Sequence, residues 1–166
     1  MKKLLAIAAF ILPITMTEAK TKADLDPENT LLIDLDDGQV VIEMYPDTAP
    51  KHVARIKELA KAGKYDGVAF HRVIDGFMAQ TGDVQFGNVK KFNDGRVGTG
   101  GSDKPDIPAE FNKRKHVRGT CSMARSGNPN SANSQFFICF GNANFLDGQY
   151  TVWGQVVEGM EFVDKL

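Results

Sequence analysis

Short apolar segments separated by turn signals run through most of this 166-residue chain, and they limit what it can fold into. Segments with the length and side-chain content of strands lie at 31–35, 40–44, 68–74, 77–80, 117–123, 135–140 and 150–156. Helical signals are fewer: one segment begins at Thr48-Ala49-Pro50 and stops at Gly63, and a second begins at Glu158. Many short strands with two helices predict a mainly β fold, an antiparallel barrel or sandwich, rather than alternating βαβ units.

One long segment, residues 82–110, has no clear strand or helix pattern and is rich in Gly, Asp, Asn and Pro. A surface loop of this length usually has a function when it is ordered. It contains Gly98-Thr99-Gly100-Gly101, which lacks the glycine spacing of a dinucleotide fingerprint and does not follow a buried strand. We interpret these glycines as part of a flexible loop.

The composition is that of an ordinary globular protein, with 42% hydrophobic and 25% charged residues. The length fits one domain, or a short leader followed by one domain. The formal net charge of -1 predicts no electrostatic attraction to nucleic acid or to an anionic membrane.

Residues 1–19 have the order of a cleavable secretory signal peptide: Lys2 and Lys3, an apolar stretch at 4–14, then small or polar residues up to Ala19. The apolar stretch is about half of the roughly 20 residues that span a bilayer, so we expect no permanent membrane anchor. A buried or surface N-terminal helix is the alternative interpretation.

Cleavage after Ala19 leaves residues 20–30 as a short N-terminal extension of a domain at 31–166, and cleavage after Ala23 is also possible. The leader predicts a soluble exported protein, which in a bacterium means the periplasm. That compartment permits a disulfide between Cys121 and Cys139. Their apolar surroundings favour two buried free thiols instead, and we expect neither to lie near the site described next.

The segment 70–80 is unusual because Arg72 stands in an otherwise apolar strand pattern, followed closely by Phe77, Met78 and Gln80. Residues 70, 72 and 74 of an extended strand project to one face, so the pattern predicts an apolar groove with one fixed cation. The alternative is an exposed strand edge on which Arg72 forms a surface salt bridge.

The sequence resembles the cyclophilins, a family of peptidyl-prolyl cis-trans isomerases that bind cyclosporin. The blocks that carry the resemblance run in the family's order at 70–72, 76–83, 130–138, 145–148 and 156–160. The resemblance implies a closed eight-stranded antiparallel β-barrel with two helices. It also implies that the chain, which ends at Leu166, stops before the last strand of that barrel.

Site residues follow from the resemblance position by position. The family's catalytic arginine corresponds to Arg72. The residues that correspond to its proline pocket are Phe77, Met78, Phe137 and Leu146. The residues that correspond to groove contacts are His71, Gln80, Ala124, Arg125, Ser126 and Gln135.

Three rim positions depart from many eukaryotic members of the family. Phe145 stands in place of a tryptophan, Tyr150 in place of a histidine, and Arg125 in place of an asparagine. The missing indole implies that cyclosporin binds only weakly, while catalysis survives.

The resemblance therefore implies an isomerase that accelerates rotation of X-Pro bonds in exported or unfolded polypeptides, acts as a monomer, and uses no metal or cofactor. The main alternative is a non-catalytic module that holds Pro-containing segments as a chaperone or assembly partner. A serine hydrolase has little support, because Ser134 has no obvious histidine and acid partners.

Overall fold

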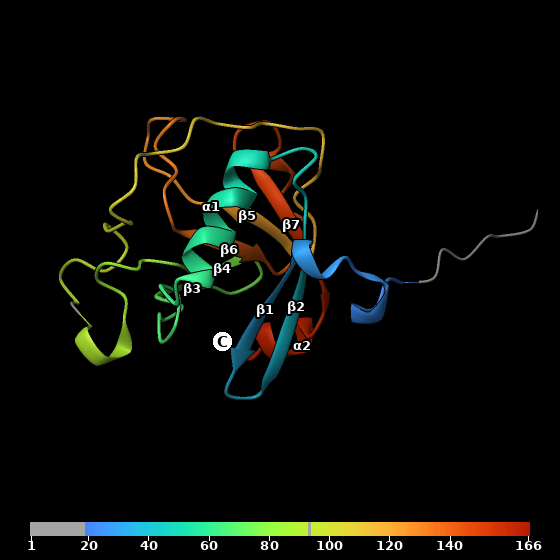
Figure 1. Ribbon diagram of the computed structural model, residues 1–166, viewed down its shortest axis with the longest axis horizontal. Helices are drawn as coiled ribbons and strands as arrows, with labels where there is room; N and C mark the ends of the chain where they lie inside the picture. The colour runs from blue at the N-terminus through green and yellow to red at the C-terminus, as the bar shows by residue number, and fades with distance from the viewer. Residues whose placement is uncertain (1–18, 93) are drawn as a thin grey trace, which may run out of the picture.

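The computed structural model describes residues 19–92 and 94–166 (Figure 1). The predicted signal peptide lies outside the described residues, apart from Ala19. Within the described ranges, no helix combines the length and apolar character needed to cross a membrane.

Seven antiparallel strands form one curled sheet, so the expectation of a mainly β fold is confirmed. The strands are β1 (Thr30–Leu35), β2 (Gly38–Met44), β3 (Arg72–Ile74), β4 (Met78–Thr81), β5 (Thr120–Met123), β6 (Phe136–Cys139) and β7 (Val152–Glu158). They lie in the order β1-β2-β7-β5-β6-β4-β3. Because β1 and β3 stand at the two ends of this order, the described sheet does not close into a barrel.

Two helices accompany the sheet, at opposite ends of it in Figure 1: α1 (Pro50–Lys61) and α2 (Met160–Val163). Proline at the first position of α1 suits a helix start, since its missing N–H is not needed there. The Glu110 carboxylate accepts the backbone N–H groups of Lys51 and His52 and so caps this helix. Short 3₁₀ turns occur at η1 (Lys22–Asp24), η2 (Pro27–Asn29), η3 (Val89–Lys91) and η4 (Asn144–Leu146).

Residues 20–30, expected as a short extension, lie against the sheet. The backbone N–H of Lys22 donates to Glu158 at 2.6 Å, and the Lys20 ammonium lies 2.7 Å from Glu43. The Leu25 side chain is buried. These contacts hold the segment along β2 and β7.

The apolar residues form two clusters. The larger one surrounds Trp153 between the sheet and α1. The smaller one consists of Met78, Phe137, Cys139 and Ala143, with Phe77, Ala124, Leu146 and Tyr150 packed against it.

Two expectations need correction. The strand expected at 68–74 is confined to β3, because residues 68 and 69 bond instead to the loop near Asn88 and Gly87. Phe70 consequently packs on the larger cluster, whereas Arg72 is exposed.

Cys121 and Cys139 are buried free thiols as expected. Cys139, however, belongs to the cluster beneath the candidate site, which the sequence placed far from both thiols.

Candidate active site

Arg72 is placed by the β3–β4 hairpin, in which it pairs with Gln80. Its guanidinium Nη1 donates to the Gln80 amide oxygen at 3.3 Å. Among the described residues it makes no ion pair, so the surface salt bridge considered above is absent from this part of the chain. The guanidinium is thus exposed and charged, with an amide as its acceptor.

A cavity of about 210 Å³ opens beside this guanidinium. It is lined by Arg72, Phe77, Met78, Gln80, Ala124, Arg125, Phe137, Leu146 and Tyr150. Phe137 and Met78 come from adjacent strands and are almost completely buried, so they form the base of the cavity. The cavity is apolar at its base and carries a cation at its rim, which suits a small apolar ring attached to a polar backbone.

Beneath Phe137 lies a buried polar cluster that sequence reasoning missed. The His116 ring stacks under Phe137 with the centroids 6.2 Å apart. Its Nδ1 lies 3.0 Å from Asp147, and its Nε2 lies 2.9 Å from the Ser122 hydroxyl. Burial lowers the pKa of His116, and the backbone N–H of His116 helps lower the pKa of Asp147 to about 2. Ser122 is completely buried, so this Ser–His–Asp arrangement supports the base of the cavity and does not reach a substrate.

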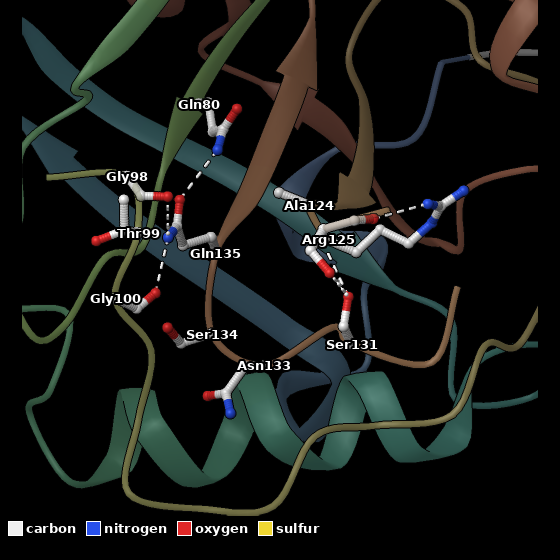
Figure 2. A pocket seen from close by; sticks show the side chains of 11 residues that line it. Gln80, Gly98, Thr99, Gly100, Ala124, Arg125, Ser131, Asn133, Ser134 and Gln135 are labelled. Atoms are coloured by element: carbon white, nitrogen blue, oxygen red, sulfur yellow. Dashed lines mark hydrogen bonds between the residues drawn. The ribbon is translucent and has the colours of Figure 1, made fainter. Parts of the chain in front are cut away.

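A second cavity, of about 390 Å³, adjoins the first and shares Gln80, Ala124 and Arg125 with it (Figure 2). Its other lining residues are Gly98, Thr99, Gly100, Ser126, Ser131, Asn133, Ser134 and Gln135. Several of these belong to segments that sequence reasoning treated only as loops. The glycines at 98–101 were the sequence signal for this, since glycine allows the backbone to approach another segment closely.

Arg125 and Tyr150, two of the three positions that depart from the family pattern, form one wall of the smaller cavity. The Arg125 guanidinium lies over the Tyr150 ring, 4.3 Å from its centroid. It also donates to the carbonyl oxygens of Ser126 and Gln149. Tyr150 in turn meets Phe137 edge-to-face at 5.9 Å. The wall is therefore held by a cation–π contact, two hydrogen bonds and an edge-to-face aromatic contact.

Two expected site residues stand apart from the cavities, and the rest line one or both of them. His71 is partly buried behind the loop at Gly98, where burial lowers its pKa. Phe145 is 65% exposed and packs against Phe77 with the ring centroids 5.4 Å apart.

The protein is thus a mainly β protein whose curled antiparallel sheet carries an arginine beside a cavity with an apolar base. Comparison with known proteins identifies its family. Residues 30–166 match the family described as cyclophilin type peptidyl-prolyl cis-trans isomerase/CLD. The chain belongs to this family and is an enzyme, a cyclophilin-type peptidyl-prolyl cis-trans isomerase.

Curated relatives agree. The chain is 61% identical over 163 residues to a probable peptidyl-prolyl cis-trans isomerase of Brucella suis, which covers 98% of this chain and 83% of that protein. It is 39% identical over 132 residues to a peptidyl-prolyl cis-trans isomerase of Helicobacter pylori, covering 78% and 74%.

Solved structures agree as well. The chain resembles the cyclophilin AquaCyp293 of Hirschia baltica with a TM-score of 0.73 and 28% identity, covering 89% of this chain and 74% of that one. It resembles a Cryptosporidium parvum cyclophilin, solved in the presence of the dipeptide Ala-Pro, with a TM-score of 0.72 and 28% identity, covering 82% and 84%.

Proposed function

We propose that the two adjoining cavities bind Pro-containing polypeptides and that Arg72 accelerates rotation about the X-Pro bond. The observation that carries this proposal is the place of Arg72: its guanidinium has no carboxylate partner among the described residues and bonds to Gln80 at the rim of a cavity whose base is formed by Met78 and Phe137. The Cryptosporidium parvum relative, solved with Ala-Pro, supports a Pro-containing peptide as the ligand.

The chemistry follows from the amide bond. Its rotational barrier is about 18–20 kcal/mol, because nitrogen shares its lone pair with the carbonyl. Twisting the bond returns the lone pair to nitrogen, which becomes an acceptor only near the transition state. A donor aimed at the prolyl nitrogen therefore stabilises the twisted amide more than either planar isomer, as catalysis requires.

Arg72 suits this role because its guanidinium stays charged and donates from a rigid plane. A hydrogen bond to a charged group contributes about 1.5–3 kcal/mol, or one to two decades in rate. The apolar base formed by Met78 and Phe137 would hold the ring and exclude water, which strengthens that bond. Gln80 lines both cavities beside the guanidinium, where a substrate backbone would pass.

We further propose that the clients are exported polypeptides in the periplasm, supported by the signal-like order of residues 1–19. The closed eight-stranded barrel likewise remains a prediction of the family resemblance. The ends of the described sheet at β1 and β3 are where a further strand would pair.

The test is exchange NMR on a short X-Pro peptide, which needs no coupling protease, with wild-type protein, Arg72→Ala and Arg72→Lys. Arg96→Ala is the matched control, because Arg96 is exposed, lies over Phe86 and lines neither cavity. We expect Arg72→Ala to fold and to lose up to about 100-fold in turnover. Arg72→Lys should recover only part of it, because an ammonium lacks the planar donor pair.

Near-normal turnover in Arg72→Ala would remove Arg72 from the mechanism. A folded wild-type protein that binds the peptide without accelerating exchange would instead establish the non-catalytic alternative, a module that holds Pro-containing segments.

A further inference from the structure

The long segment 82–110 reaches the candidate active site through residues 98–100, which we call the strap. The strap carbonyls of Gly98 and Gly100 both accept from Nε2 of Gln135, at 3.0 and 2.7 Å (Figure 2). A carbonyl oxygen can only accept, so these contacts fix which end of the Gln135 amide carries the nitrogen. The Gln135 oxygen then accepts from Gln80 Nε2 at 3.0 Å, which leaves the Gln80 oxygen facing Arg72.

The opposite side of the strap is held by Asp83, whose side chain is completely buried. Its Oδ2 accepts the backbone N–H groups of Gly98 and Gly100, at 2.7 and 3.0 Å. Its Oδ1 accepts those of Gln85 and Phe86, at 3.1 and 2.8 Å. An ionised carboxylate only accepts, and bonds from several N–H groups are what make its burial tolerable.

The packing around the strap leaves no room for a side chain at position 100. A Cβ added to Gly100 would overlap the Asp83 carboxylate and would lie 2.8 Å from the Gln85 side chain. A side chain there would therefore push the strap away from Asp83 and from Gln135. This close approach explains the glycine at position 100.

We propose that Asp83 is a positioning residue for Arg72. By holding the strap, Asp83 sets the direction of the Gln135 and Gln80 amides, and these present an oxygen to the guanidinium. Without the strap, the Gln80 amide loses its preferred direction, and its nitrogen can turn toward the donors of Arg72. The inference rests on the proposed role of Arg72 and adds the residue that keeps the guanidinium in place.

Two variants disturb the strap in different ways. Asp83→Asn keeps the shape but replaces one acceptor oxygen with a donor, and Gly100→Ala displaces the strap while the carboxylate remains. Their matched controls are Asp103→Asn, at an exposed position, and Gly127→Ala, where an added Cβ meets nothing within 4 Å.

We expect each strap variant to lower the kcat of peptide exchange about tenfold and to change KM by a smaller factor, since the Arg72 bond forms only in the transition state. We expect the side-chain 15N resonances of Arg72, Gln80 and Gln135 to shift in the same variants. The controls should leave kcat unchanged. Folded variants with unchanged kcat and unchanged resonances, or with a change in KM alone, would overturn the proposal.

The wild-type protein provides a test that needs neither a folded variant nor isomerase activity. We expect through-hydrogen-bond NMR couplings from Gln135 Nε2 to the carbonyl carbons of Gly98 and Gly100. Their absence would refute the positioning role. If wild-type protein lacked isomerase activity, the function proposed for Arg72 would fail, whereas these couplings and the Arg72 resonances would still decide whether Asp83 orients the guanidinium.

Discussion

Phe137 gives the sharpest quantitative prediction, because its ring serves both the cavity and the core. Only 5% of the residue is exposed, and its ring lies between the buried His116 and the Tyr150 edge. Phe137→Ala removes the ring and leaves a void next to a buried polar cluster. Substitutions of this kind in a packed core cost about 3–5 kcal/mol.

That cost is large against a total stability of about 5–15 kcal/mol for a domain. At about 2–4 °C per kcal/mol for a chain of this size, the melting temperature should fall by about 6–20 °C. Phe145→Ala is the matched control, because Phe145 packs against the cavity residue Phe77 but is 65% exposed. Its loss should cost about 1 kcal/mol or less.

The assay is urea unfolding followed by the fluorescence of Trp153, the only tryptophan in the chain and a completely buried one. The midpoint should shift without a change in the slope with urea, which reports the surface exposed on unfolding. A loss below about 1 kcal/mol for Phe137→Ala, or an equal loss for Phe145→Ala, would refute the view that Phe137 carries the base of the cavity.

Two further predictions concern pH and an inhibitor. Burial lowers the pKa values of His52, His71 and His116 from 6.5, so below that pH the unfolded chain takes up protons that the folded chain excludes. The free energy of unfolding should be fully present above pH 6.5 and fall as the pH drops below it, which urea titrations at several pH values measure. A histidine that titrates at or above pH 6.5 in the folded protein would contradict this. Phe145→Trp should tighten cyclosporin by up to about tenfold in an inhibition assay, because it restores an indole donor, and unchanged inhibition would count against the rim position of residue 145.

Local patterns were sufficient for most elements of the fold. Asp36-Asp37-Gly38 between two apolar runs predicts the β1–β2 hairpin, because the turn is encoded by its own residues. The proline at position 50 and the glycine at position 63 predict α1 for the same reason. The expected strand at 68–74 was too long, because the first residues of that segment bond to a loop that is distant in sequence. No local pattern contains that information.

The site residues divide in the same way, into those that a sequence pattern marks and those whose partners are distant in sequence. The arginine in an apolar pattern marked Arg72, and the family resemblance marked the residues of the smaller cavity and part of the larger one, but not the strap. Asp83 lies at the end of the family block 76–83 but was assigned no role, because a carboxylate in a loop is usually solvated, and only the fold shows its four backbone donors. His116 and Ser122 were missed because their partners lie on other segments.

The sequence by itself determined the mainly β fold, its turns and helices, and the family to which the chain belongs. These follow from short-range periodicity, turn chemistry and ordered motifs, which are properties of neighbouring residues. The tertiary structure decided that Cys139 belongs to the cluster beneath the cavity and that Gln135 bonds both to the strap carbonyls and to Gln80, which bonds to Arg72. Those facts depend on side chains that only folding brings within hydrogen-bonding or van der Waals distance.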